Sequence, residues 1–147
     1  MKQWCFNFAL LLALPAVPVF SAASLPGAYF PLLEAGAVEV ELRLNSLSNP
    51  DLKSLETEQR WRHFPYVILA PAVLYAKKHP ENPRYQDPKM LALALRIGDL
   101  QASEHEKGLY EPRGDSDWDT GLWLEAFRLL SKDLGEERRK RWQRAIE

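Results

Sequence analysis

The sequence predicts an all-α fold. Apolar residues recur at helical spacing through most of the chain after residue 30. Two segments, 66–76 and 90–100, are apolar on nearly every side, which is typical of buried helices. Asn49-Pro50 and Asp87-Pro88 each place a capping residue before a proline, an arrangement that favours a helix start. We therefore expect a series of helices that pair as antiparallel hairpins.

The N-terminal segment is typical of a secretory signal peptide. Lys2 precedes an apolar run from Phe8 to Phe20, and Ser21-Ala22-Ala23 supplies small residues for a signal peptidase. The run is interrupted by two prolines and is too short for a membrane span, which takes ~20 apolar residues. We expect cleavage of residues 1–23, a secreted or periplasmic location, and one helical domain over residues 24–147. An uncleaved anchor is the alternative.

Composition and motifs exclude several classes of function. The only cysteine, Cys5, lies within the signal, so the mature domain has no disulfide. The formal charge is −1, or −2 once Lys2 is removed, which favours neither nucleic acid nor an anionic membrane as a partner. We find no Ser or Cys nucleophile motif, no Gly-rich phosphate loop and no zinc-ligand spacing, and expect neither cofactor nor metal.

Three helices are expected between residues 31 and 80. Pro31 suits the N1 position of the first, whose apolar residues recur as far as Leu47. Apolar and polar residues also alternate from 38 to 44, which is a strand-like signal. Asn49-Pro50 starts the second helix. The third covers residues 66–76, and Pro71 should kink it or delay its start.

Three more helices are expected after residue 87. The first runs from Pro88 to about Gln101. Ser116 and Asp119 form a capping box for the next, whose apolar stripe continues to Leu134 before a C-cap at Gly135.

The last helix begins at Glu136, and its basic run, residues 138–144, is interpreted as a solvated face. No cap precedes Glu147, so we expect the chain to be the amino-terminal part of a larger helical protein. A short protein with a frayed end is the alternative.

Three stretches carry a resemblance to a known family: WRHFPYVILAPAVLYAKKHPENPRYQDPKMLALALRIGDL, EPRGDSDWDTGLWLEAFRLL and LGEERRKRW. They are similar to the opening helices of secreted bacterial (α/α)-toroid proteins, the heparinase II/III-type and alginate-lyase-type polysaccharide lyases. The resemblance covers the chain from about Tyr29. It implies the opening part of an (α/α) toroid and an acidic polysaccharide or oligosaccharide as partner, held in a groove across one rim. It also implies eliminative cleavage in the full-length protein, by residues of later helices, so this fragment alone should be inactive.

The segment YEPRGDSDWDTGLW, residues 110–123, is the first candidate site. Counted from Asp115, an EF-hand loop would have Thr120 where glycine belongs and Ala126 in place of the bidentate carboxylate, which argues against calcium. The Arg-Gly-Asp tripeptide is common by chance.

Two interpretations of this segment stay open. Its acids and Ser116 could serve only a helix start. Alternatively, the segment forms a sugar-binding rim, where a ring stacks on an aromatic face and polar groups bind hydroxyls. The residues of that rim are Tyr110, Arg113, Asp117 and Trp118.

RWRHFPY, residues 60–66, is the second candidate site. Arg62 could clamp a carboxylate, and His63 and Tyr66 have side chains that transfer protons. The alternative is a helix-to-helix corner with a structural histidine. Two functions therefore remain open: part of a carbohydrate-active toroid enzyme, or a non-catalytic secreted module that binds a glycan or a protein.

Overall fold

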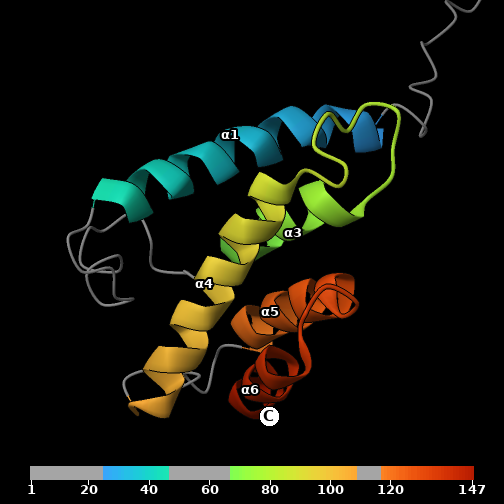
Figure 1. The fold of residues 1–147 in the computed structure, drawn as a ribbon. Helices are drawn as coiled ribbons and strands as arrows, with labels where there is room; N and C mark the ends of the chain where they lie inside the picture. Colours follow the sequence, from blue (N-terminus) through green and yellow to red (C-terminus); the bar gives the residue numbers. More distant parts are fainter. Residues whose placement is uncertain (1–24, 47–66, 109–116) are drawn as a thin grey trace, which may run out of the picture.

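The computed structural model describes residues 25–46, 67–108 and 117–147 (Figure 1). Within these ranges every regular element is a helix and no strand occurs, which confirms the all-α prediction. The helices are α1 (Leu25–Ser46), α3 (Leu69–Ala76), α4 (Pro88–Glu106), α5 (Asp117–Leu130) and α6 (Glu136–Ile146). Pairing into hairpins and a toroid stays a prediction.

The short helix α3 lies at the centre of the described part. It contacts α1, α4 and α5, while α6 packs on α4 and α5. Figure 1 shows α1 on one side of α3, with α5 and α6 on the other. The largest fully buried apolar side chains come from all five helices and the turn before α3: Leu44, Ile68, Leu74, Ile97, Trp123, Leu130 and Trp142. The other helices therefore cover much of α3, as expected for a helix whose sequence is apolar on nearly every side.

Helix α1 corrects the expected role of Pro31. The helix begins at Leu25, so Pro31 lies inside it rather than at N1. Phe30 is buried, and its ring lies 5.2 Å from the ring of His79, between centroids. This packing favours helix on the N-terminal side of Pro31, despite the backbone hydrogen bond that proline cannot donate. The strand-like alternation from 38 to 44 does not produce a strand, because the buried residues of α1 recur at helical spacing.

Helix α3 confirms the delayed start. A 3₁₀ turn at Val67 and Ile68 precedes Leu69, so Pro71 is the third residue of the helix. A backbone N–H in the first turn has no partner within the helix, and proline is tolerated there. The C-terminal end is closed by buried Asn82, whose Nδ2 donates to the carbonyl oxygens of Leu74 and Lys77, at 2.7 Å in each case.

Helix α4 begins as the sequence predicts and ends later. Oδ1 of Asp87 accepts a hydrogen bond of 2.9 Å from the backbone N–H of Lys89, and Pro88 is at N1. The helix continues to Glu106 instead of ending near Gln101, because Gln101, Ala102 and Glu104 are drawn into the interior. Tertiary burial here overrides a polar local sequence.

The connection between α5 and α6 corrects the role of Gly135. Helix α5 ends at Leu130, and Leu134 is buried in the turn that follows. The backbone N–H of Leu134 donates to the carbonyl of Leu130 at 3.1 Å. Gly135 has φ −60° and ψ 157°, so it is the extended N-cap of α6 and not a left-handed C-cap of α5. The capping role of Ser116 lies outside the described residues.

Candidate functional site

The two sites predicted from the sequence fall mostly outside the described part of the chain. Asp117 and Trp118 are in the first turn of α5, but their side chains are not described. The other five lie outside the described residues: Arg62, His63, Tyr66, Tyr110 and Arg113. Both candidate sites therefore stay predictions.

Among the described residues, a set of polar contacts joins α4 to α6. Gly98 makes the close approach possible, because a Cβ atom at that position would lie 2.1 Å from Cζ2 of Trp142. The indole is fully buried, and its Nε1–H donates to Oδ1 of Asp99 at 2.9 Å. Its ring also lies near that of Trp123, with centroids 6.4 Å apart. Trp142 is thus the wedge that holds α6 against both α4 and α5.

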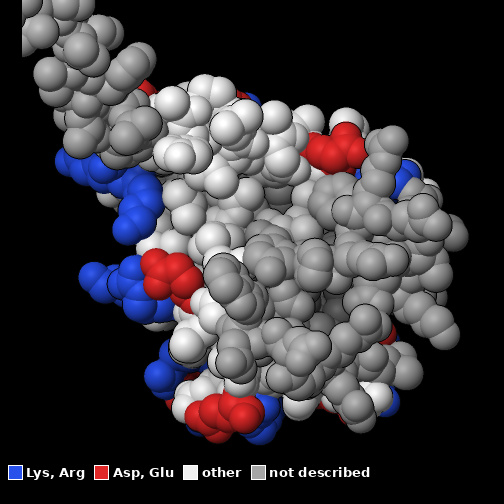
Figure 2. All heavy atoms as spheres, turned by 180° about the vertical axis from the view of Figure 1, so that it is seen from behind, with Lys and Arg blue, Asp and Glu red and all other residues white. Residues whose placement is uncertain are grey.

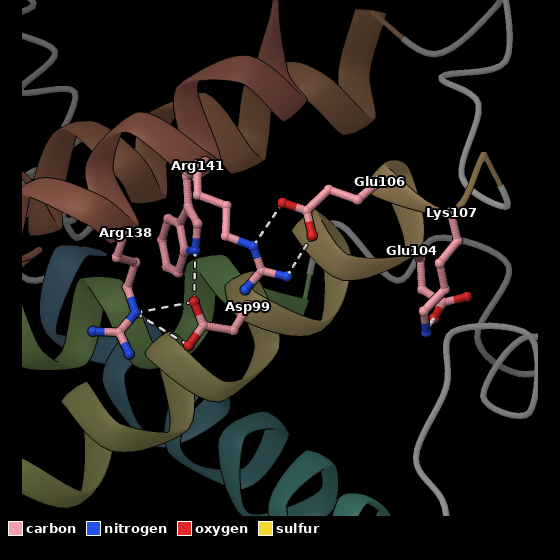
Figure 3. A network of polar contacts seen from close by, with 7 residues as sticks. Asp99, Glu104, Glu106, Lys107, Arg138 and Arg141 are labelled. Carbon is pink, nitrogen blue, oxygen red and sulfur yellow. Dashed lines mark hydrogen bonds and ion pairs between the residues drawn. The ribbon is translucent and has the colours of Figure 1, made fainter.

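Two arginines of α6 extend this contact along α4 (Figure 3). Nε of Arg138 donates to both carboxylate oxygens of Asp99, at 2.9 and 3.1 Å. Nε and one terminal nitrogen of Arg141 donate to the two oxygens of Glu106, at 2.9 and 2.8 Å. The hydrogen bond from Arg141 holds the pKa of Glu106 below its ordinary value, and the same bond raises the pKa of Arg141. The two parallel hydrogen bonds of Arg141 fix its guanidinium plane, whereas Arg138 shares one N–H between the two oxygens of Asp99.

This interface corrects the interpretation of the basic run as a solvated face. Arg139 and Lys140 do pair within α6, with Glu136. Arg138 and Arg141, by contrast, pair with acids of α4. The acids of α4 and the bases of α6 are visible in the sequence, but no local pattern shows that α4 faces α6.

A hollow of about 520 Å³ opens beside the α4–α6 contact. Its lining comes from Asp99 of α4, Gly135, and five charged residues of α6, namely Glu136, Glu137, Arg138, Arg141 and Arg144. The side chain of Arg144 makes no hydrogen bond or ion pair within the described part of the chain, and neither does that of Glu137. Carboxylates accept from hydroxyl groups, and a guanidinium donates to hydroxyls or carboxylates. The hollow therefore suits a polar ligand rich in hydroxyl groups.

The C-terminal end of α4 places further polar groups in the interior. Glu104 is 2% exposed and accepts a hydrogen bond of 2.8 Å from Nζ of Lys107. Both polar atoms of the Gln101 amide are buried without a partner among the described residues, as is Nδ1 of His105.

A second hollow, of about 320 Å³, separates α5 from α6. Its walls are mainly apolar, from Leu124, Phe127 and Ile146. Polar side chains and the C-terminal residue complete the lining: Ser131, Arg139, Gln143 and Glu147. We call it the α5–α6 groove. It suits an apolar side chain rather than a sugar.

Two features are absent from the residues that the structure describes. No group of three or more His, Cys, Asp or Glu side chains is placed to hold a metal ion there. No helix in the same ranges combines the length and hydropathy of a membrane span.

Compared with family models, curated proteins and solved structures, the chain has no significant match. The class that its own residues define is a helical domain, built around a central helix and carrying a charged hollow between α4 and α6.

Proposed function

We propose that this chain is an exported helical domain that binds an acidic polysaccharide. The observation that carries the proposal is the α4–α6 hollow, in which every lining residue except Gly135 is charged and both signs are present. Sugar hydroxyls require donors and acceptors side by side, and a uronate carboxylate requires a cation. A hollow with three carboxylates and three guanidiniums provides all of these.

Arg144 and Glu137 are the best candidates to contact the ligand. The other two arginines of the hollow, Arg138 and Arg141, already bind Asp99 and Glu106. Arg144 is exposed and has no hydrogen-bond or ion-pair partner among the described residues, so it can bind a uronate carboxylate. The side chain of Glu137 also has no partner among the described residues, so its carboxylate can accept hydrogen bonds from hydroxyl groups.

Eliminative cleavage by the full-length protein is the second part of the proposal. It is supported by the resemblance to toroid lyases, and by the chemistry of His63 and Tyr66 as candidate proton-transfer groups. Elimination from a uronate needs a neutralised carboxylate, a base for the C5 proton and an acid for the leaving oxygen. Incubation with a uronate polymer, followed by ultraviolet absorbance of the unsaturated product, tests this step separately from binding.

Binding is tested by calorimetric titration of a uronate oligosaccharide, with a neutral oligosaccharide of equal length as comparison. Replacing Arg144 by Gln removes the charge at the hollow, and we expect affinity to fall about tenfold, the usual effect of losing a hydrogen bond to a charged group. Arg128→Gln is the matched control, because Arg128 is an exposed arginine of α5 whose partner is Glu125. Equal affinities for both variants would contradict the assignment of the hollow.

The rim predicted from the sequence is tested in the same titration. Trp118→Ala should weaken binding by ~1–2 kcal/mol if the ring stacks on a sugar. Arg113→Lys should also weaken it, because lysine keeps the charge but loses the fork. If the segment serves only as a helix start, Ser116→Ala lowers stability by about 1 kcal/mol and Arg113→Lys changes nothing.

A non-catalytic module that binds a protein is the alternative function. It is favoured by the exposed apolar side chains of α1, which include Leu32 at 68% and Leu42 at 62% exposure. Exposed apolar surface of this kind marks interaction sites in soluble proteins.

A further inference from the structure

The arginines of the hollow between α4 and α6 keep many unused hydrogen-bond donors. A guanidinium carries five N–H donors. Arg138 uses one of them, the Nε–H that Asp99 accepts, and so keeps four. Arg141 uses two on Glu106 and keeps three, while Arg144 uses none within the described part of the chain. A ligand that fills the hollow must therefore supply many acceptors.

Two of the three carboxylates that line the hollow are already occupied. Both oxygens of Asp99 accept hydrogen bonds. Glu136 pairs with Arg139 and Lys140, and neither of these bases lines the hollow. Glu137 is the lining acid without a partner among the described residues. A hydroxyl group both donates and accepts, whereas a carboxylate only accepts, so the excess of unused donors favours a ligand with carboxylates.

Arg138 is held at one end of its guanidinium and open at the other. The buried indole of Trp142 donates to Oδ1 of Asp99, and both Asp99 oxygens accept from Nε of Arg138. The two terminal nitrogens of Arg138 form no hydrogen bond within the described part of the chain, and Figure 3 shows them turned away from Asp99. The side chain is 36% exposed. Its terminal nitrogens are therefore a fork that can bind a carboxylate through two parallel hydrogen bonds.

Arg144 offers a second fork further along α6. It lies six residues after Arg138, which corresponds to about 9 Å along the helix axis. One carboxylate has two oxygens and fills one fork. Occupying both arginines therefore takes two acidic groups.

The surface around α6 is not a continuous positive field. Figure 2 shows acidic and basic side chains side by side at the lower end of the molecule, the end that α6 occupies in Figure 1. A mixed surface attracts anions weakly at long range. Recognition of an acidic ligand therefore depends on individual donors at short range.

We propose that the hollow binds two acidic groups of one ligand, one at the terminal nitrogens of Arg138 and one at Arg144. The ligand is then an oligosaccharide with a uronate on two or more of its units, and Asp99 is the positioning residue for Arg138. Arg141, three residues from each of the other arginines, keeps donors for hydroxyl groups between the two carboxylates. This inference rests on the proposed function, and adds the second acidic group and the residue that binds it.

Calorimetric titration of the unmodified protein with galacturonate trimer and monomer tests the need for two acidic groups. The trimer can occupy both arginines, so we expect it to bind at least about tenfold more tightly than the monomer. Methyl esterification of the trimer, which removes its charges, should abolish this gain. Equal affinities for trimer and monomer would overturn the proposal.

Arg138→Lys tests the fork itself, because lysine keeps the charge but has no fork. Affinity for the trimer should fall about tenfold, whereas affinity for the monomer should stay nearly the same, since Arg144 is unchanged. Arg139→Lys is the matched control: it makes the same substitution on the same helix, outside the lining of the hollow, and should change neither affinity. Circular dichroism melts of both variants should match that of the unmodified protein.

Asp99→Asn tests the positioning role. Asparagine can still accept from the indole of Trp142, but without its charge it holds Nε of Arg138 less firmly. We expect weaker binding of the trimer and unchanged binding of the monomer. If Asp99 only repelled the acidic ligand, the trimer would bind more tightly to the variant, and if Asp99 only shaped the hollow, both ligands would bind more weakly. Either result would overturn the positioning role.

The outcomes separate this inference from the proposed function. If Arg144→Gln weakens binding of the trimer and Arg138→Lys does not, the second acidic group has no place at Arg138, and the proposed function stands. If the unmodified protein binds neither trimer nor monomer, the proposed function is wrong, and this inference with it.

Discussion

Replacing Gly98 by Ala tests whether Trp142 is the wedge between α4 and α6. The added methyl carbon would lie 2.1, 2.3 and 2.6 Å from three carbons of the indole, whereas ordinary contact begins at 3.4 Å. The indole must therefore move by more than 1 Å, or the helices must separate. A fully buried, planar ring has little freedom to do so, and movement also disturbs its 2.9 Å hydrogen bond to Asp99.

Three effects set the change in the free energy of unfolding: two lower it and one raises it. Overfilling a packed site costs about 1–3 kcal/mol. A weakened hydrogen bond to a carboxylate adds about 1 kcal/mol. Alanine is the better helix former by about 1 kcal/mol, which offsets part of the loss. We expect Gly98→Ala to lower the free energy of unfolding by about 2 kcal/mol, and the melting temperature by several degrees.

Urea unfolding followed by circular dichroism measures this change, and Gly121→Ala is the matched control. Gly121 is also inside a helix, but an added Cβ there meets nothing within 4 Å. The control should therefore be stabilised by up to about 1 kcal/mol. A Gly98→Ala protein as stable as the control would refute the close approach. In a double-mutant cycle, Trp142→Phe should relieve part of the defect, with a coupling energy of about 1 kcal/mol or more.

Three further predictions concern the cap, the ion pairs and export. Asp87→Ala should lower the stability of the protein by about 1 kcal/mol, because the cap of α4 is lost. Asp87→Asn should retain most of that stability, since asparagine also caps a helix. Thermal melts of both variants test this. The pKa of Glu106 is lowered in the folded state, so its contact with Arg141 stabilises above the ordinary value of 4.5 and is lost as pH falls below it. The stability difference between Glu106→Gln and the unmodified protein should therefore shrink in urea titrations at pH 3.5, and a pH-independent difference would contradict the pairing. Mass spectrometry of the exported protein should find an N-terminus near Ser24, and an intact Met1 on a cytosolic product would contradict the signal.

The features that the sequence predicted correctly depend on local chemistry. The cap at Asp87 with Pro88 after it, and the delayed start before Pro71, follow from which backbone N–H groups lack partners in a first turn. These constraints act within a few residues. They hold whatever the rest of the chain does.

The incorrect predictions concern residues whose role depends on distant contacts. Pro31 lies inside α1 because Phe30 packs beside His79, far along the chain. Helix α4 passes Gln101 because its polar end is buried. The arginines of α6 do not form only a solvated face, because Arg138 and Arg141 donate to the carboxylates of Asp99 and Glu106 on α4. Local periodicity contains no information about which helix lies opposite.

The candidate site depends on the same packing of α6 against α4 that the Gly98→Ala variant would disturb. The hollow exists because α6 lies against α4 at the distance set by Gly98 and Trp142. Asp99 belongs to both, since it accepts from the indole and lines the hollow. A change at Gly98 should therefore alter ligand binding although its own side chain is a hydrogen atom, whereas a change at Arg144 should alter binding without altering stability. If Gly98→Ala weakens the fold but leaves carbohydrate affinity intact, the ligand does not occupy this hollow, and the rim near Trp118 becomes the stronger candidate.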